Sequence, residues 1–288
     1  MMKNIKASTI SVTLTLLMLL SGAAGAAEAL TTTRPNLTPW LVAHRGAKVY
    51  MPENTIAAFQ KAIDLGFDFI ELDVRYTKDG IPVCMHDEKI NRTTGGDGYV
   101  KDMTAEEITR LDAARGYFSA PDKFKNTPVP TLEQALQMMQ GKIKLYLDQK
   151  EPPTPVLIEL LKKYNFLPDN MIVVGSNEFQ KKFRELVPDA PVMPNASKAE
   201  EIEQLLKEFP GAYAFNTTCP NVDEEFVDKA HGNGVRVFIN TLGWCDQPML
   251  MEKMLRLGPD AIQSDHPEAL FQLLKKLKKK AEKEKVRN

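Results

Sequence analysis

The sequence predicts an α/β fold, a (β/α)8 TIM barrel. Two observations predict it: short β-branched apolar runs recur along the chain, and amphipathic helical patterns lie between most of them. A barrel of this kind needs about 250 residues, which the 288-residue chain supplies. The eight runs expected as parallel strands are residues 41–44, 69–75, 143–148, 171–175, 191–193, 213–216, 235–240 and 261–264.

The first expected helix, residues 54–65, illustrates the helical signals. Asn54 is its expected N-cap, apolar residues such as Ile56 and Phe59 recur at helical spacing, and Gly66 follows its end. The other expected helices are residues 131–139, 178–186, 198–209, 223–231 and 247–257.

Residues 82–86 form a further apolar run that breaks the alternation of strand and helix. The link before it, residues 77–80, is too short for a helical crossover between parallel strands. Asp79-Gly80 is instead a hairpin turn signal. We therefore expect the second strand to extend past the barrel, turn, and return His86 toward the strand ends, where barrel active sites lie.

The two ends of the chain differ from the repeating middle. A basic N-terminus, an apolar core and small residues around Ala24 and Ala26 predict a cleaved signal peptide and hence export to the periplasm or medium. A membrane anchor is the alternative, but the apolar core is short for one. The expected division is signal peptide 1–27, leader 28–39, barrel 40–272 with an insertion at about 88–130, and charged tail 273–288.

Bulk composition narrows the class of protein. Hydrophobic residues make up 43% and charged residues 26%, a globular balance, and the net charge of -1 gives no basic footprint for nucleic acid. The Lys-rich tail allows weak contact with an anionic membrane surface. The three cysteines match no zinc spacing and predict no disulfide framework; Cys84 is expected in the core.

Glu71 and Asp73 are the strongest candidates for chemistry. They alternate along one strand and so share a face, where two carboxylates would repel unless a cation lay between them. Oxygen ligands of this kind suit Mg²⁺ or Ca²⁺; a structural salt-bridge pair is the alternative. Asp148 and Lys150 end another strand and could add a third carboxylate and a phosphate contact, although a local ion pair is equally compatible with their spacing.

Two histidines are expected at the same rim. His44 follows the first strand and His86 ends the hairpin, so the pair could act as general acid and general base. Arg45 offers a planar fork for phosphate, and Gly46 permits a tight turn or a close approach.

These residues occur in motifs that resemble the glycerophosphodiester phosphodiesterase family. The matching motifs, in order, are His44-Arg45-Gly46, Pro52-Glu53-Asn54-Thr55, Glu71-Leu72-Asp73-Val74, Thr77-Lys78-Asp79-Gly80, His86-Asp87 and the closing Asp260-Ala-Ile-Gln-Ser-Asp265-His-Pro267. The resemblance covers residues 40 to about 272 and is most specific from His44 to Asp87. It implies a PI-PLC-like TIM barrel that hydrolyses glycerophosphodiesters to glycerol 3-phosphate and an alcohol.

The resemblance also implies a role for each matched residue. His44 and His86 would be the catalytic pair, and Glu71, Asp73 and Asp148 would hold the divalent ion. Arg45 and Lys150 would bind phosphate, and Glu53 would orient Arg45 or lie near the ion. The implied partner is a small glycerophosphodiester; the sequence leaves the oligomeric state open.

This chain departs from the family pattern at two positions. Asp148 stands where Glu is usual, and Asn240 stands where a tryptophan usually walls the glycerol group. Trp244, Phe238, Tyr117 and Phe118 are the candidates to replace that ring. The alternative functions are a related phospholipase acting on lysophospholipids or phosphoinositides, and a noncatalytic phosphate-ligand binding protein.

Overall fold

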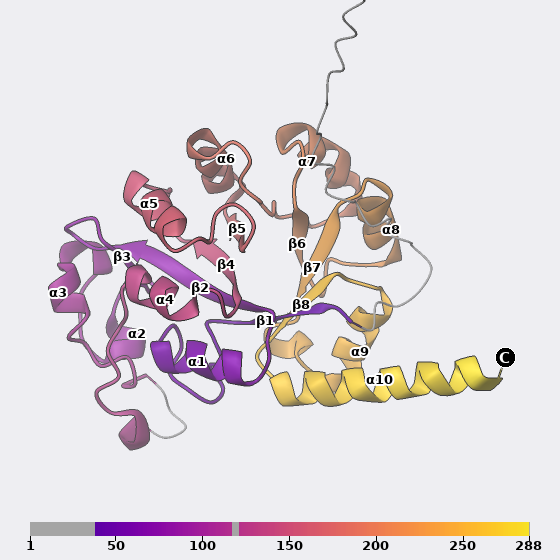
Figure 1. The fold of residues 1–288 in the computed structure, drawn as a ribbon, viewed down its shortest axis with the longest axis horizontal. Helices are drawn as coiled ribbons and strands as arrows, with labels where there is room; N and C mark the ends of the chain where they lie inside the picture. The colour runs from indigo at the N-terminus through magenta and orange to yellow at the C-terminus, as the bar shows by residue number, and fades with distance from the viewer. Residues whose placement is uncertain (1–37, 117–120, 288) are drawn as a thin grey trace, which may run out of the picture.

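Seven parallel strands form the wall of a barrel in the computed structural model, which describes residues 38–116 and 121–287 (Figure 1). The strands are β1 (Trp40–Ala43), β2 (Phe69–Tyr76), β4 (Lys144–Gln149), β5 (Met171–Gly175), β6 (Ala214–Thr218), β7 (Arg236–Asn240) and β8 (Ala261–Ser264). The predicted signal peptide and all but the last two residues of the predicted leader lie outside the described residues.

The strand order confirms the predicted barrel. It runs β5-β4-β2-β1-β8-β7-β6, with parallel pairing throughout this path. The predicted strand at 191–193 is reduced to parallel bridges, Val173 with Val192 and Asn195 with Asn216. The segment therefore contacts β5 on one side and β6 on the other. These two bridges nearly close the sheet into a barrel.

Helices cover the outside of this wall (Figure 1). They are α1 (Ile56–Asp64), α4 (Leu132–Met139), α5 (Pro155–Lys163), α6 (Asn177–Leu186), α7 (Ile202–Glu208), α8 (Glu224–Gly232), α9 (Pro248–Arg256) and α10 (Pro267–Arg287). The predicted cap of the first helix is wrong by one residue: the Thr55 side chain accepts from the Ala58 amide, so Asn54 is free for another role. Helix α5, capped by Thr154, was not predicted.

Alternation along the strands separates two apolar layers. Ile70 and Leu72 of β2 belong to the large cluster that packs beneath the helices, whereas Phe69 points into the barrel. Inside the barrel, the Phe69 ring meets those of Trp40 and Phe238 with centroids 5.7 and 5.9 Å apart. These rings fill the lower barrel, so polar residues higher on the same strand faces gather at one end.

The predicted hairpin and insertion are both present beside β2. Strand β3 (Pro82–Cys84) pairs antiparallel with β2, with Val74 opposite Cys84. The insertion holds α2 (Asn91–Thr94), α3 (Ala105–Ile108) and two short 3-10 turns, Val100–Asp102 and Pro121–Phe124. It packs against the hairpin through a small apolar cluster, made of Val83, Met85, Ile90, Val100, Ile108, Ala113 and Val129.

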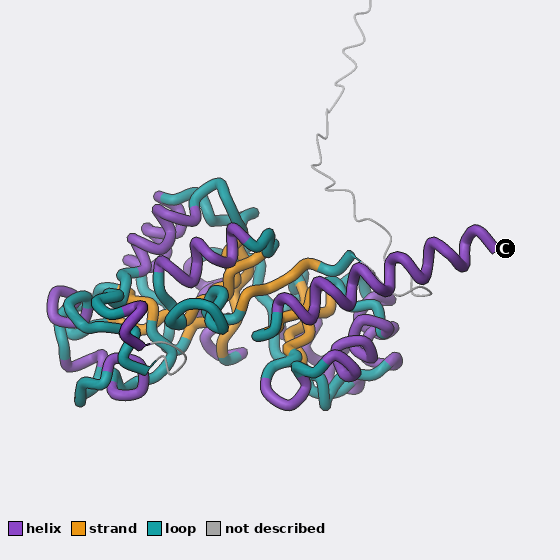
Figure 2. The backbone as a smooth tube through the Cα atoms, turned by 90° about the horizontal axis from the view of Figure 1, so that it is seen from below, coloured by secondary structure: helices purple, strands orange, loops and turns teal. Residues whose placement is uncertain are grey.

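Helix α10 runs without a break across the predicted boundary at residue 272. Leu273, Leu274 and Leu277 are buried, so its first part packs on the barrel, while its C-terminal end projects past the body (Figures 1 and 2). Among the described residues, no helix combines the length and apolar character needed to cross a membrane.

Cys219 and Cys245 form a disulfide, which corrects the expectation that the cysteines form no framework. The two residues are 26 positions apart in sequence but follow the neighbouring strands β6 and β7, whose ends the barrel brings together. Cys84 is free and buried, as predicted.

We expect loss of this disulfide to destabilise the fold without unfolding it. Closing a loop of this length removes about 3.5 kcal/mol of chain entropy from the unfolded state. Cys219→Ser/Cys245→Ser should therefore lower the denaturant midpoint, and reductant should lower the midpoint of the wild-type protein alone. Equal midpoints for the wild type with and without reductant would contradict the prediction.

Candidate active site

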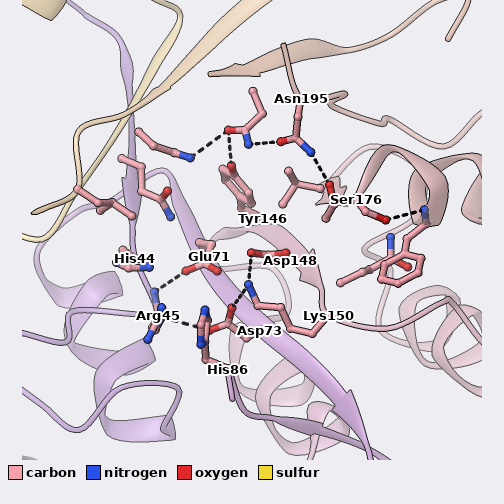
Figure 3. A pocket seen from close by; sticks show the side chains of 18 residues that line it. His44, Arg45, Glu71, Asp73, His86, Tyr146, Asp148, Lys150, Ser176 and Asn195 are labelled. Atoms are coloured by element: carbon pink, nitrogen blue, oxygen red, sulfur yellow. Dashed lines mark hydrogen bonds and ion pairs between the residues drawn. The ribbon is translucent and has the colours of Figure 1, made fainter. Parts of the chain in front are cut away.

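A cavity of about 540 Å³ opens at the carboxyl ends of the strands (Figure 3). All of the predicted catalytic and metal-binding residues line it: His44, His86, Glu71, Asp73 and Asp148. Arg45 and Lys150 line it too. Glu53 does not line the cavity, but it forms an ion pair with Arg45.

The turn after β1 is fixed by its backbone geometry. Arg45 and Gly46 both have positive φ, 54° and 76°, and a Cβ on Gly46 would lie only 2.8 Å from Ala58 of α1. Glycine is therefore required for the close approach predicted here. The turn aims the Arg45 amide at Glu71, and that amide donates to Oε2 at 2.6 Å.

Glu71, Asp73 and Asp148 each offer an oxygen within 4.8 Å of the others. Strand register explains this meeting, because Asp73 on β2 lies directly opposite Asp148 on β4. Glu71 and Asp73 are only 2% and 1% exposed. The predicted grouping of three carboxylates is thus present in the structure.

The electrostatics of this group suit a divalent cation. Burial, followed by the charges of Asp73 and Asp148, raises the pKa of Glu71 well above its usual value. Burial likewise raises the pKa of Asp148. A bound cation would relieve this repulsion, and an all-carboxylate set is the hard-oxygen chemistry that Mg²⁺ and Ca²⁺ prefer. The residues therefore fit the implied ion.

Asp73 is held by a separate set of partners. Asn54, released from helix capping, donates to Oδ2 at 2.7 Å and accepts from the Asp73 amide at 3.2 Å. Arg45 Nε lies 3.4 Å from the same carboxylate, and Lys150 Nζ lies 2.9 Å from its other oxygen. Burial opposes ionisation, but Lys150 and Arg45 outweigh it and lower the pKa of Asp73.

Lys150 bridges two carboxylates, because Nζ also lies 2.6 Å from Asp148 Oδ2. The local ion pair considered from sequence is therefore present. Burial would lower the pKa of Lys150, but Asp73 and Asp148 raise it above its usual value. The three carboxylates and the two cations, Arg45 and Lys150, leave one negative charge unmatched.

His44 is positioned by Asp265, a residue that the sequence did not single out as functional. Its Nδ1 lies 2.8 Å from Asp265 Oδ1, and Lys48 Nζ lies 3.0 Å from the other oxygen. The Asp265 amide donates to buried Asp246. With Nδ1 engaged, Nε2 remains for proton transfer. Burial, against the opposing effect of Asp265, lowers the pKa of His44 and favours the neutral imidazole.

His86, which follows β3 at the end of the hairpin, also has its Nδ1 atom engaged by a carboxylate. Its Nδ1 lies 2.6 Å from Asp87 Oδ1. Arg92 of the insertion pairs with Asp87 and also donates to Glu53 at 2.7 and 2.8 Å. Glu53 in turn accepts from Arg45 NH1 at 2.9 Å. The insertion therefore connects both histidine-bearing loops, and Glu53 orients Arg45 as one of its two expected roles.

Asp265→Asn should lower kcat/KM by about 10²-fold, at the lower end of what acid–base groups contribute. Asp265 raises the pKa of His44 against burial, so removing its charge should also move the acid limb of the pH profile to lower pH. The pH dependence of kcat/KM on a phosphodiester substrate measures both effects. An unchanged acid limb would show that Asp265 does not act through His44.

The proposed replacements for the missing tryptophan are not supported by the described residues. Trp244 is 63% exposed and does not line the cavity, and Phe238 is buried in the barrel interior. Tyr117 and Phe118 lie outside the described residues. The aromatic residues that do line the cavity in the described chain are Tyr146 and Phe179.

The two remaining histidines do not line the cavity. His231 lies in the last turn of α8 with Nε2 2.9 Å from Asp260 Oδ2. His266 lies in the loop after β8 and is exposed.

Comparisons with known proteins agree with this geometry. The glycerophosphoryl diester phosphodiesterase family matches residues 44–269. A glycerophosphodiester phosphodiesterase from Caldanaerobacter subterraneus is 35% identical over 250 residues, covering 82% of this chain and 98% of that protein. One from Bacillus altitudinis is 31% identical over 248 residues, covering 83% and 99%.

Two solved structures share the fold. A glycerophosphodiester phosphodiesterase from Agrobacterium tumefaciens has a TM-score of 0.71 and 27% identity, covering 81% of this chain and 99% of that one. An Oleispira antarctica phosphodiesterase, solved with the product sn-glycerol-3-phosphate, has a TM-score of 0.72 and 26% identity, covering 82% and 97%.

The barrel and its rim of carboxylates, histidines and cations thus define a phosphodiesterase class of enzyme. The chain belongs to the glycerophosphoryl diester phosphodiesterase family, as its sequence motifs predict.

Proposed function

We propose that this protein hydrolyses glycerophosphodiesters to glycerol 3-phosphate and an alcohol, with the help of a divalent cation, in the cavity at the strand ends. One observation carries the proposal. His44 and His86 line the same cavity as the three carboxylates, and each has its Nδ1 held by a carboxylate. That arrangement leaves two Nε2 atoms for proton transfer around one bound phosphate.

The two histidines divide the proton transfers. One Nε2 accepts a proton from the attacking hydroxyl or water, and the other donates a proton to the departing alkoxide. The neutral form of His44, favoured by burial, is suited to accepting the proton. This assigns the role of base to His44 and leaves the role of acid to His86.

The charged residues hold the phosphate between these histidines. Glu71, Asp73 and Asp148 would hold Mg²⁺ or Ca²⁺, which supplies positive charge for a phosphoryl oxygen and lowers the pKa of the attacking hydroxyl. Arg45, fixed by Glu53, and Lys150, fixed by Asp73 and Asp148, present N–H donors to the other oxygens.

The lining of the cavity favours small polar diesters over lipids. It is built mostly from charged and amide side chains, with few apolar residues such as Val174, Phe179 and Leu242. A lysophospholipid would bring a long acyl chain that this lining does not match. The noncatalytic alternative gains no support, since both histidines and all three carboxylates are present.

Product identification tests the proposal. Purified protein would be incubated with glycerophosphodiesters and, separately, with lysophospholipids, and the phosphorus-containing products would be resolved by ³¹P NMR. Glycerol 3-phosphate from the diesters supports the proposal. Turnover of lysophospholipids alone would favour the phospholipase alternative, and ligand binding without turnover would favour the binding protein.

We also propose that the protein is exported. The predicted signal peptide supports this, and so does the Cys219–Cys245 disulfide, since disulfides persist mainly in oxidising compartments. Cell fractionation after expression of the full chain tests it, and an uncleaved cytosolic product would contradict it.

Weak contact with membranes is proposed for the lysine-rich part of α10 from Lys275 onward, which includes its projecting end. It carries Lys275, Lys276, Lys278, Lys279, Lys280 and Lys283. Co-sedimentation with anionic vesicles, lost at high salt, would support the contact, and equal sedimentation with neutral vesicles would contradict an electrostatic origin.

A further inference from the structure

Asp246 is a buried carboxylate that takes no part in the chemistry proposed above. It follows the 3-10 turn Gly243–Cys245 in the connection between β7 and α9, is 5% exposed and does not line the cavity. Placing a carboxylate away from water is costly unless donors of the protein replace the lost hydration. The groups that supply these donors indicate what the residue does.

The donors come from the turn that follows β8. Asp246 Oδ2 accepts from the backbone amide of Asp265, and Oδ1 accepts from the Ser264 hydroxyl at 2.7 Å. The oxygen of the Ser264 hydroxyl in turn accepts from the backbone amide of His266 at 2.9 Å. Asp246 therefore holds two successive amides of this turn, one directly and one through a hydroxyl group.

The same turn carries the carboxylate that contacts His44. Asp265 Oδ1 lies 2.8 Å from His44 Nδ1, and Lys48 Nζ lies 3.0 Å from Oδ2. Lys48 belongs to the same loop as His44 and contacts only the side chain of Asp265, whereas Asp246 fixes the main chain of Asp265 from another loop. A carboxylate can hold an imidazole in one orientation only if the carboxylate is itself held in place.

The position of Asp246 is fixed from the side of β6. Cys245, the residue before it, forms the disulfide with Cys219, and these two residues are 2% and 6% exposed. The Asp246 amide also donates to the Gly243 carbonyl at 3.1 Å. The connection after β7 is thus tied to the end of β6 by the disulfide and to the end of β8 by Asp246.

We propose that Asp246 is a positioning residue that acts through Asp265 to hold His44 in the orientation needed for proton transfer. This inference rests on the proposed function, and the Cys219–Cys245 disulfide serves as the anchor of Asp246. Because Asp246 lies outside the cavity, its loss should affect the chemical step and not the binding of substrate. The effect should therefore appear in kcat with KM unchanged.

A pair of matched substitutions tests the route through Asp265. Asp246→Asn keeps the size of the side chain but places an amide NH₂ where one of two donors needs an acceptor. We expect kcat for a glycerophosphodiester to fall about tenfold, the equivalent of one hydrogen bond to a charged group. In the Asp265→Asn background the same change should cost less than about twofold, because the contact with His44 is already weakened. Equal losses in the two backgrounds, or an effect on KM alone, would overturn the inference.

A milder variant covers the case in which Asp246→Asn does not fold, which thermal midpoints report. Ser264→Ala removes one of the two links to the turn and should lower kcat about threefold; an unchanged kcat in this variant would then overturn the inference. Asp260→Asn is the matched control. Asp260 also accepts from a backbone amide, that of Val237 at 2.8 Å, and contacts a histidine, His231, but it lies at the opposite end of β8. It should retain the wild-type kcat.

Nuclear magnetic resonance gives a readout that does not depend on turnover. The Nδ1 proton of His44, assigned by its absence from His44→Ala, should resonate downfield while it is bound to the Asp265 carboxylate. We expect it to move upfield in Asp246→Asn and to keep its position in Asp260→Asn. If the wild-type protein turns over no diester, the proposed function fails and this resonance still tests the positioning. An unchanged resonance in Asp246→Asn would overturn the inference.

Discussion

His44→Ala and His86→Ala should each lower kcat/KM for a glycerophosphodiester by about 10²- to 10⁴-fold, the usual contribution of one acid–base group. Each substitution removes the imidazole and with it the Nε2 atom assigned to proton transfer. It also breaks the contact between Nδ1 and its aspartate, which lies outside the apolar core. The unfolding midpoint should therefore change little. Steady-state kinetics and a thermal melt measure the two effects on the same samples.

His266→Ala is the matched control for these variants, because His266 is an exposed histidine beside the same rim. It should retain wild-type kcat/KM. Near-normal turnover in His44→Ala or His86→Ala would remove that residue from the mechanism. Loss in one variant alone would leave a single acid–base group and contradict the paired assignment.

Glu71→Gln should abolish tight binding of the divalent ion. The substitution keeps the size of the side chain and an acceptor for the Arg45 amide, but it removes one of three buried negative charges. We expect affinity for Mg²⁺ or Ca²⁺ to fall more than about 100-fold, because a charged ligand of the ion itself is lost. Calorimetric titration of EDTA-treated protein measures the affinity.

Thermal melts separate ion binding from folding in the same variant. An ion that binds only the folded state raises the midpoint of the wild-type protein. It should not raise that of Glu71→Gln, whose metal-free midpoint should match or exceed the wild type because a buried repulsion is gone. Glu106→Gln, exposed on α3, is the control. Wild-type affinity in Glu71→Gln would contradict the ion site.

The sequence was sufficient to predict the parts of the site that depend on local periodicity. Glu71 and Asp73 share a face because strand residues alternate, and Asp148 joins them because parallel strands end at the same rim. The Asp-Gly turn likewise predicted the hairpin that returns His86. These features required the order of elements and the barrel, but no detailed side-chain contacts.

Residues that act through distant contacts were missed. Asp265 is 221 positions from His44, and Arg92 meets Glu53 across 39 positions. Asn54 was interpreted as a helix cap, because its contact with Asp73 depends on how the first loop folds over β2. The Cys219–Cys245 disulfide was not predicted either, because the two cysteines are distant in sequence and are brought together only by the fold.

Two errors in the fold have different causes. Helix α5 carried readable signals, with Thr154 as cap, Pro155 in the first turn and a buried face at Leu157 and Leu161, and could have been predicted. The segment at 191–193, by contrast, is too short for a regular strand, and only its neighbours β5 and β6 show that it completes the barrel.

The most direct test of the metal-dependent mechanism is the release of glycerol 3-phosphate from a glycerophosphodiester by purified protein. It would be measured after EDTA treatment and again after Mg²⁺ or Ca²⁺ is restored. Loss of release in EDTA and recovery with one of these ions is the predicted result. Undiminished release by protein that elemental analysis shows to be free of metal would contradict the account.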